Sequence, residues 1–321
     1  MNDMPEMIDM KPQEVRVAVL MGGPSSEREI SLKSGRSVSL ALGSKGYSVV
    51  EIDPDQDLKK KITEAHVHAA FIALHGRFGE DGTVQKMLDT WNIPYTGSSP
   101  EASFLALRKD LAKTEFDRLN ILTPRWSRGP FGRFDNLRDA VEKLGFPVVL
   151  KPVDEGSSIG LEMVRSQSEL RSAFERICIH SADFIAEQYI QGRELTVGIL
   201  DGQTLPIVEI KTTRPFYDFS AKYSAGYTEY EVPAVMDSKS SQKIQEYAFR
   251  AHCILGCRDF SRVDILLDSD QHPWVLEVNT IPGFTERSLL PKAAAAIGIS
   301  FQDLCERILK MCLARGQHVK A

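Results

Sequence analysis

Three oxygen-bearing side chains are spaced so that together they can hold a divalent metal ion. In the stretch 262–283, apolar and polar residues alternate on either side of a polar turn at 269–272, which predicts a β-hairpin. A period of two puts Glu277 and Asn279 on one face of the returning strand, and pairing brings Asp264 to that face. Magnesium typically takes one or two carboxylates plus nucleotide phosphates. The face therefore predicts a magnesium site with Arg262 close by; the alternative is a hairpin with one solvated face.

The residues after the hairpin can bind an anion. Pro282 and Gly283 form a bend, and the residues from Thr285 begin a predicted helix that ends at 296. A glycine amide at the bend can approach a bound anion, and the helix N-terminus adds a favourable dipole.

Two lysines and a small-residue loop indicate a phosphate site. A predicted strand at 146–150 is followed by Lys151 and by the Gly/Ser-rich loop 154–160, and 161–164 is again extended. Backbone N–H groups and hydroxyls of such a loop can cradle phosphates next to a lysine. Lys109 lies in a predicted helix at 100–120. The alternatives are a plain hairpin turn and a solvated lysine.

A further strand is predicted at 184–190, after a helix at 168–181. Its backbone N–H and C=O groups can pair with the edge of an adenine ring, and a nearby carboxylate can hold ribose hydroxyls. Glu187 and Glu194 are the carboxylates in and just after this strand.

The first hundred residues read as a βαβ unit that ends near Gly97. A strand at 15–20 runs into a glycine turn, and Ser26 with Glu29 predicts a capping box for a helix to about Gly43. Further strands are predicted at 47–52, 69–74 and 93–95, with a helix at 83–91. The arrangement is a ligand site of Rossmann type, although the absence of a Gly-x-Gly-x-x-Gly motif disfavours a dinucleotide.

Two residues of that unit are candidates for ligand contact. Glu27 at the helix start is either an acid favoured by the helix dipole or a partner for an ammonium group. His75 opens the loop 75–82, which contains three glycines and two acids at a strand's C-terminal end, where open α/β sheets place ligands.

The remaining elements complete the expected fold. Strands at 195–200 and 205–212 pair through an Asp201-Gly202 turn. The aromatic stretch 214–232 lacks a clear period and reads as a long loop of the kind that often serves as a lid. Helices are predicted at 238–256 and 301–314.

Composition excludes several classes of protein. The 321 residues allow two or three domains, and the 42% apolar and 26% charged residues are typical of a globular protein. A net charge of -5 without a Lys/Arg block argues against nucleic acid, and no apolar run approaches the ~20 residues of a membrane span. The polar opening residues and the five cysteines, read as buried reduced thiols, predict a cytoplasmic protein.

Five motifs, in order from about Val15 to Leu313, resemble the D-alanine–D-alanine ligases of the ATP-grasp superfamily. They are MGGPSSEREISLKSG, FIALHGRFGEDG, VVLKPVDEGSSIG, FYDFSAKY and RVDILLDSDQHPWVLEVNTIPGFTERSLLP. The resemblance implies a mixed α/β and α+β protein with a three-domain ATP-grasp architecture. The expected domains are an N-terminal Rossmann-like parallel-sheet domain at 1–97, a central ATP-grasp subdomain at 98–191 and a C-terminal ATP-grasp domain at 192–321.

The resemblance also implies how ATP and metal are bound. Lys109 and Lys151 would contact the phosphates, and the loop of Ser157 and Ser158 would close over them. Glu187 and the backbone near Ile190 would contact the adenine, Glu194 would contact the ribose, and Lys222 would belong to the same site. Two magnesium or manganese ions would be held by Asp264, Asn279 and a bridging Glu277.

The substrate contacts follow in the same way. Glu27 would bind the ammonium of the first D-alanine beside His75, and Ser157 and Tyr223 would join Glu27 in a relay that holds the lid closed. Arg262 and the Gly283 amide would stabilise the oxyanion. Ser288 and Leu289 would receive the carboxylate of the second D-alanine.

The implied activity is ATP-dependent formation of D-alanyl-D-alanine through an acyl phosphate, for peptidoglycan and hence cell-wall synthesis and cell shape, by a homodimer. The alternatives are a D-alanine–D-lactate ligase, which the intact Ala221-Lys222-Tyr223 disfavours, a catalytically inactive ATP-grasp sensor, and another ATP-grasp carboxylate–amine ligase. One departure is Arg108, where many relatives carry an acidic residue before the phosphate lysine.

Overall fold

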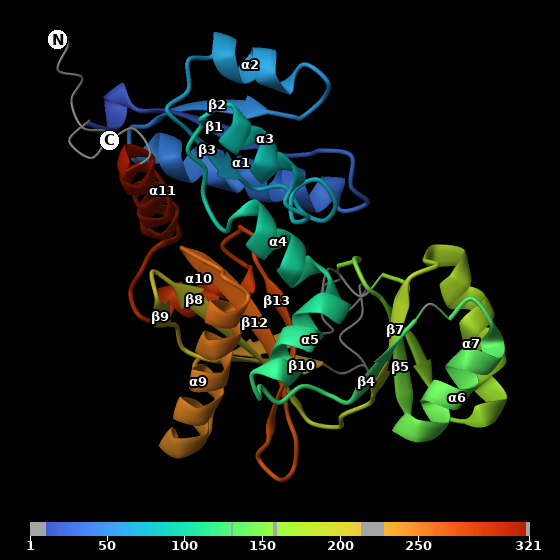
Figure 1. Cartoon of the computed structure of the whole chain (residues 1–321). Helices are drawn as coiled ribbons and strands as arrows, with labels where there is room; N and C mark the ends of the chain where they lie inside the picture. Colours follow the sequence, from blue (N-terminus) through green and yellow to red (C-terminus); the bar gives the residue numbers. More distant parts are fainter. Residues whose placement is uncertain (1–10, 130, 157–158, 213–227, 319–321) are drawn as a thin grey trace.

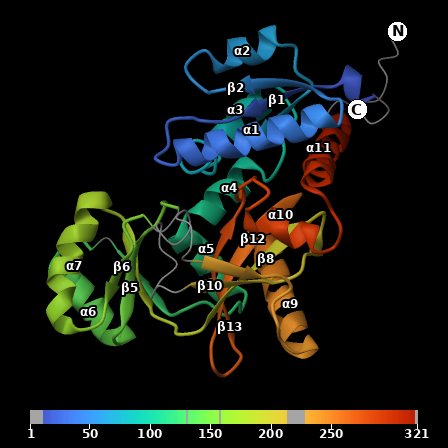
Figure 2. The ribbon, with the colours of Figure 1, turned by 180° about the vertical axis from the view of Figure 1, so that it is seen from behind.

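The computed structural model describes residues 11–129, 131–156, 159–212 and 228–318, and it contains three β-sheets (Figure 1). The first sheet lies at the top of both views, and the second and third sheets lie beside each other below it (Figures 1 and 2). This mixed architecture agrees with the predicted fold class. The domain boundaries at 97 and 191 stay predictions.

The first sheet is parallel, in the order β2-β1-β3. Residues 17–20 of β1 are completely buried, which explains why this strand is apolar without alternation. The predicted strands at 15–20, 47–52 and 69–74 and the predicted helices are present, and a helix at 58–64 was not predicted. The elements are η1 (Pro12–Glu14), β1 (Arg16–Leu20), α1 (Arg28–Ser44), β2 (Ser48–Ile52), α2 (Leu58–Glu64), β3 (Ala69–Ile72) and α3 (Thr83–Thr90).

Two local predictions in this unit are wrong. Helix α1 begins at Arg28, and its N-cap is Glu27 without a side-chain capping bond, so Ser26 forms no capping box. The turn is closed instead by Ser25, whose hydroxyl accepts from the Glu27 N–H at 3.0 Å. The segment 93–95 is no strand, because it contributes only a single parallel bridge between Tyr95 and Ala70.

The predicted helix at 100–120 is two helices, α4 (Pro100–Leu107) and α5 (Lys109–Arg118). Arg108 between them has an extended backbone, with φ -76° and ψ 95°. The Lys109 N–H donates to the Val153 carbonyl at 2.9 Å instead of continuing the helix. This tertiary hydrogen bond, which the helical pattern cannot show, places Lys109 at the start of a helix.

The second sheet is antiparallel, in the order β4-β7-β5-β6, and α6 and α7 cover one of its faces (Figure 1). Buried Leu137, Val141, Leu150, Leu170 and Phe184 form its core. Strand β4 and helix α6 lie where the sequence predicted only a polar connection. The elements are β4 (Trp126–Arg128), α6 (Phe134–Leu144), β5 (Val148–Pro152), β6 (Glu162–Val164), α7 (Gln167–His180) and β7 (Phe184–Gln188).

The third sheet is also antiparallel, in the order β11-β10-β8-β12-β13 with β9 paired to β8. Asp201 and Gly202 form the predicted turn with φ of 54° and 70°. The loop predicted at 214–232 ends in a strand at 228–231 that pairs with β10, and 213–227 lies outside the described residues. The elements are β8 (Arg193–Leu200), β9 (Gln203–Thr204), β10 (Val208–Thr212), β11 (Thr228–Glu231), α9 (Ser238–Ile254), β12 (Phe260–Leu267), β13 (Pro273–Asn279), α10 (Leu289–Ala295) and α11 (Phe301–His318).

The C-terminal helix α11 returns to the first sheet, where it lies beside α1 (Figures 1 and 2). Its buried Leu304, Ile308 and Cys312 belong to the same apolar cluster as β1 and β3. Helix α4 lies between this unit and the third sheet in both views. The first and third sheets are therefore joined by a shared core.

Some smaller expectations need correction. Helix α10 begins at Leu289, because the Thr285 N–H donates to the Ser288 hydroxyl in a turn that precedes the helix.

Cys305 and Cys312 are buried as predicted, but Cys178 and Cys253 are exposed, and all five thiols are free. Among the described residues, none of the helices combines the length and the apolar character that crossing a bilayer requires.

The buried His252 on α9 predicts a pH-dependent stability. Burial lowers the pKa of His252 from 6.5 to about 4, and its Nδ1 lies 2.7 Å from the Ser261 hydroxyl. Between these two values the unfolded chain binds a proton that the folded chain does not, so stability falls as the pH falls from 6.5 to about 4. The loss amounts to about 3 kcal/mol.

Urea unfolding of the wild type and of His252→Gln at pH 7 and pH 4.5 measures this contribution. The variant should lose less stability than the wild type over this interval. An equal loss in the two proteins would show that His252 does not carry the dependence.

Candidate active site

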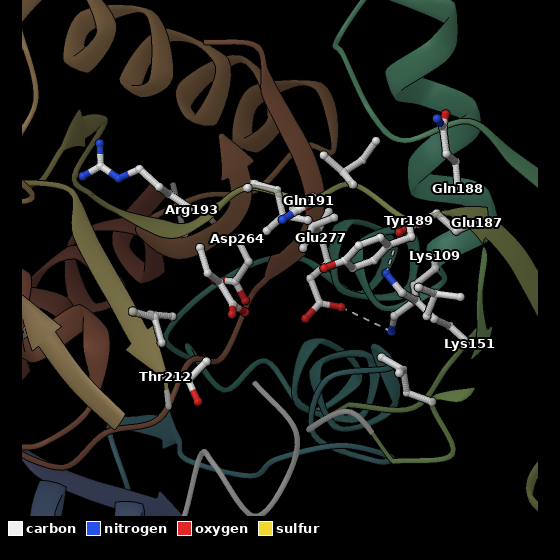
Figure 3. A pocket seen from close by; sticks show the side chains of 18 of the residues that line it. Lys109, Lys151, Glu187, Gln188, Tyr189, Gln191, Arg193, Thr212, Asp264 and Glu277 are labelled. Carbon is white, nitrogen blue, oxygen red and sulfur yellow. Dashed lines mark hydrogen bonds and ion pairs between the residues drawn. The ribbon is translucent and has the colours of Figure 1, made fainter. Parts of the chain in front are cut away.

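A cavity of about 590 Å³ lies between the second and third sheets (Figure 3). Apolar side chains form its walls, and charged side chains gather around them. Four of the residues predicted to bind nucleotide or metal point into it: Asp264 and Glu277 from one side and Lys109 and Lys151 from the other. The apolar lining includes Val149, Pro152, Ile159, Leu161, Ile190, Ile210, Leu266 and Leu276.

Lys109 enters the cavity from the first residue of α5. Its Nζ donates to the Glu155 carbonyl at 2.7 Å and lies 3.4 Å from Oε2 of Glu277. It therefore links the small-residue loop of the second sheet to β13 of the third. Its side chain is 11% exposed, which rules out the solvated lysine that the sequence left open.

Lys151 on β5 is held by Glu187 on the neighbouring strand β7. The Lys151 Nζ donates to Oε1 of Glu187 at 2.6 Å, and Nζ of Lys113 lies 2.8 Å from Oε2 of the same carboxylate. Burial alone would raise the pKa of Glu187, but the two ammonium groups outweigh it and lower that pKa. Burial lowers the pKa of Lys113, an effect that Glu187 partly offsets. Glu187 is thus an ionised carboxylate that orients Lys151.

The hairpin of β12 and β13 brings the predicted metal ligands together. Asp264 is paired directly with Glu277, and Nδ2 of Asn279 donates to Oδ2 of Asp264 at 3.1 Å. Asp264 also accepts from Nε and Nη2 of Arg262, each at 2.8 Å, and from the Thr196 hydroxyl at 2.7 Å. The predicted face of two carboxylates and an amide is confirmed.

These oxygens fit a divalent cation. Two carboxylates and an amide on paired strands offer hard ligands at the mouth of a cavity that also contains two lysines. Among the described residues, no cluster of three His, Cys, Asp or Glu side chains has metal-binding geometry. A bound ion would therefore need further oxygen ligands, which nucleotide phosphates provide.

Glu27 lies where the first unit meets the loop after β5, and it is only 7% exposed. Backbone from two glycines closes around its carboxylate: a Cβ on Gly156 would lie 2.9 Å from Oε2 of Glu27, and one on Gly76 would lie 3.0 Å from it. Glycine permits both approaches, so the loop after β5 of the second sheet reaches the first unit at this carboxylate.

His75 is buried beside this region and connects β3 to the segment after β13. Its Nδ1 lies 3.1 Å from the Ile281 carbonyl and 3.4 Å from Oε1 of Glu80, and its Nε2 lies 2.9 Å from the Ser34 hydroxyl. Since a carbonyl can only accept, the Ile281 contact favours a proton on Nδ1. The structure brings His75 to the segment that contains Gly283.

Gly283 and Ser288 lie against each other, since a Cβ on Gly283 would lie 2.9 Å from the Ser288 hydroxyl oxygen. Ser288 is the N-cap of α10, and Leu289 is its buried first residue. The bend and the helix start that the sequence singled out are therefore neighbours.

Of the predicted adenine and ribose contacts, Glu187 lies in β7, Ile190 lies between β7 and β8, and Glu194 lies in β8. Ile190 and Glu194 both line the cavity, together with the residues between them. The adjacent Arg193 donates to both carboxylate oxygens of Glu209 on β10, at 2.9 and 2.6 Å, which ties the segment to the third sheet.

Four predicted site residues, Ser157, Ser158, Lys222 and Tyr223, lie outside the described residues. Lys113 and Glu80 were not predicted as site residues, although they contact Glu187 and His75, respectively. Lys113 was detectable as a lysine four residues after Lys109, on the helix face that also carries Phe116. Glu80 had no signal beyond its place in the glycine-rich loop after His75.

Arg108 has a structural role next to Lys109. Its guanidinium donates to both carboxylate oxygens of Asp110, at 3.0 and 2.9 Å, and to Asp183 at 2.9 Å. Asp110 is completely buried and also pairs with Arg128 at 3.0 Å. Burial alone would raise the pKa of Asp110, but the Arg108 and Arg128 guanidinium groups outweigh it and lower that pKa.

This chain is similar to known proteins over most of its length. The family profile described as D-ala D-ala ligase C-terminus matches residues 119–310, and the one described as D-ala D-ala ligase N-terminus matches 53–98. A D-alanine–D-alanine ligase of Anaeromyxobacter sp. (strain K) is 44% identical over 300 residues, covering 92% of this chain and 96% of the relative. One of Aquifex aeolicus is 44% identical over 295 residues, covering 92% of this chain and 100% of the relative.

Solved structures are similar over nearly the whole chain. The D-alanine–D-alanine ligase from Bacillus anthracis complexed with ATP superposes with a TM-score of 0.82 at 32% identity, covering 96% of this chain and 100% of that one. The VanG D-Ala:D-Ser ligase from Enterococcus faecalis superposes with a TM-score of 0.79 at 27% identity, covering 92% and 98%.

The Arg108 contacts predict a stability effect. Arg108→Met should reduce the free energy of unfolding by about 2 kcal/mol, because the buried Asp110 loses two charge-assisted hydrogen bonds. Urea unfolding measures the change. The matched control is Arg138→Met on α6, whose ion pairs are on the surface and which should cost less than about 0.5 kcal/mol. Equal effects of the two substitutions would contradict the assignment.

Proposed function

Because the chain belongs to the D-alanine–D-alanine ligase family, we propose that it joins two molecules of D-alanine into D-alanyl-D-alanine. One ATP is consumed, and ADP and phosphate are released. The product is a precursor of peptidoglycan, which ties the reaction to cell-wall synthesis. The chain is an ATP-dependent ligase.

One observation carries the proposal: two lysines and two carboxylates face one another across a cavity with apolar walls. The walls suit the flat adenine ring, and the lysines suit phosphates. Ile190 and its neighbours would contact the adenine, and Glu194 would contact the ribose. Glu187 supports this site through Lys151, since its carboxylate is already bonded to that ammonium at 2.6 Å.

In the first step, a carboxylate oxygen of one D-alanine attacks the γ-phosphorus of ATP, the bond to the β-phosphate oxygen breaks, and an acyl phosphate and ADP form. Negative charge gathers on the transferred phosphoryl oxygens, and Lys109 and Lys151 stabilise it. Glu27 binds the ammonium group of this D-alanine beside His75. Gly156 of the proposed phosphate loop lies close to Glu27. This supports the assignment, because a D-alanine whose ammonium group is bound by Glu27 has its carboxylate near the phosphates.

In the second step, the free amine of the other D-alanine attacks the acyl carbonyl, and the tetrahedral intermediate expels phosphate. The Gly283 amide and Arg262 stabilise the oxyanion. In this structure Arg262 is held beside the cavity by Asp264. Ser288 and Leu289 at the start of α10 receive the second carboxylate.

The metal site would hold two magnesium or manganese ions on Asp264, Asn279 and a bridging Glu277. Such ions, when bound, neutralise phosphate charge and orient the β- and γ-phosphates. Two cationic side chains of this chain already balance the charge of the carboxylates. Arg262 lies 2.8 Å from Asp264, and Lys109 lies 3.4 Å from Glu277.

Four residues outside the described ranges belong to the proposed site. We assign Ser157 and Tyr223 to a relay with Glu27, and Ser158 and Lys222 to the ATP phosphates. The chain acts in the cytoplasm, where ATP is available, as a homodimer formed through the first domain. Leu40 on α1 of that domain is 76% exposed, which is consistent with such a contact.

The proposal is tested by measuring phosphate release from ATP and magnesium with D-alanine, and by separating the products chromatographically. D-alanine alone should give D-alanyl-D-alanine, and L-alanine should give no product. Mixtures of D-alanine with D-serine or D-lactate test the second site, since one similar structure is a D-Ala:D-Ser ligase. A mixed dipeptide or a depsipeptide as main product would change the substrate assignment, and ATP binding without turnover would support a sensor.

Glu277→Gln should abolish turnover, with a fall of at least about 100-fold in kcat, because it removes charge from the proposed bridging ligand but keeps its shape. The circular dichroism spectrum should be unchanged. Glu246→Gln, on the exposed face of α9, is the matched control and should retain full activity. Wild-type activity of Glu277→Gln would refute the metal assignment.

Gly156→Ala should raise the KM for D-alanine by about tenfold, because the added Cβ lies 2.9 Å from Oε2 of Glu27 and must displace that carboxylate. The KM for ATP should change little. Gly132→Ala is the control, since a Cβ there meets nothing within 4 Å. An unchanged KM for D-alanine would show that Glu27 does not bind this substrate.

A further inference from the structure

Lys113 is a buried lysine to which the proposed reaction gives no role. It lies on α5, one helical turn after Lys109, and its side chain is 1% exposed. A lysine is rarely so buried unless it is paired. The role of Lys113 can therefore be inferred from the side chains that its ammonium group contacts.

Two side chains contact the Lys113 ammonium. Oε2 of Glu187, itself 2% exposed, lies 2.8 Å away, and the Thr123 hydroxyl oxygen accepts a hydrogen bond at 2.5 Å. Thr123 in turn donates its hydroxyl proton to the Val275 carbonyl at 2.8 Å. The ammonium group is thus fixed between β7 and β13.

The other oxygen of Glu187 accepts from Lys151, so one buried carboxylate is shared by two ammonium groups. The cluster of Lys113, Glu187 and Lys151 has a net charge of +1. Only Lys151, at 15% exposure, and not the almost completely buried Lys113, reaches the cavity appreciably. Without Lys113, Glu187 would neutralise Lys151 completely, and the cavity would lose that positive charge.

We propose that Lys113 is a positioning residue for the nucleotide phosphates: it shares Glu187 with Lys151 and so leaves Lys151 both oriented and positively charged toward the cavity. This inference rests on the proposed function, in which Lys151 contacts the phosphates of ATP. Lys113 itself does not line the cavity in which the nucleotide would bind.

The contact with Thr123 gives Lys113 a second positioning role. Val275 precedes the proposed metal ligand Glu277 by two residues, and its N–H donates to the Leu122 carbonyl at 2.8 Å. Residues 122 and 123 therefore bind both the N–H and the C=O group of Val275 on β13. Lys113 thereby links the strand of the phosphate lysine to the strand of the metal ligand.

The test is Lys113→Met, which keeps the length and the apolar stem but removes the charge. Titration calorimetry with ATP, ADP and adenosine separates phosphate binding from base binding. We expect about tenfold weaker binding of ATP and of ADP, the effect of weakening one charge-assisted contact, with adenosine unchanged. In steady state, the KM for ATP should rise while the KM for D-alanine stays the same.

A double-mutant cycle tests whether the effect passes through Glu187. In a Glu187→Gln background, Lys113→Met should change ATP affinity by less than about twofold, because the shared carboxylate charge is already absent. Lys143→Met on the exposed face of α6 is the control and should bind ATP as the wild type does.

Thr123→Val provides a second variant if Lys113→Met does not fold. It retains every charge but removes the hydroxyl that anchors Lys113, and ATP affinity should fall about threefold with adenosine unchanged. Unchanged ATP affinity in a folded Lys113→Met, or in Thr123→Val, would overturn the inference, as would equal losses for ATP and adenosine. A wild-type protein that does not bind ATP would instead refute the proposed function itself.

Discussion

The central constraint on this structure is that groups of like charge lie close together around a cavity with apolar walls. Asp264 and Glu277 are direct partners on adjacent strands, and a carboxylate pair of this kind is stable only where positive groups balance it. Arg262 and Lys109 provide that balance at 2.8 and 3.4 Å. Lys113 and Lys151 repeat the arrangement with opposite sign around Glu187. In the proposed complex, nucleotide phosphates would lie beside Lys109 and Lys151, and metal ions would lie beside Asp264 and Glu277.

The three sheets place these charges. The third sheet supplies the carboxylates through the hairpin of β12 and β13, the second supplies Lys151 on β5, and α5 inserts Lys109 between them. The first unit contributes Glu27 and His75, and α11 holds that unit against the rest through a common core. The two groups of charges and the pair of Glu27 and His75 thus come from separate parts of the chain, and their relative positions depend on how the sheets pack.

Local sequence patterns were sufficient to predict several of these features. The hairpin face of Asp264, Glu277 and Asn279 follows from a period of two, and the Asp201-Gly202 turn follows from residues that tolerate positive φ. Long-range contacts decided what the sequence could not show. The break at Arg108 requires a hydrogen bond from Lys109 to Val153, and the strand at 228–231 requires β10 as a template. The burial of Lys113 depends on Glu187, which is 74 residues away in the chain.

The most direct test of the central claim, that this cavity makes an acyl phosphate from D-alanine and ATP, is to follow oxygen. D-alanine labelled with ¹⁸O in its carboxylate is incubated with the protein, magnesium and ATP, and the released phosphate is analysed by mass spectrometry. Attack by the carboxylate on the γ-phosphorus predicts one ¹⁸O atom in each phosphate, with the other retained in the new peptide bond. Phosphate without ¹⁸O would mean that water attacked ATP, and it would contradict the account.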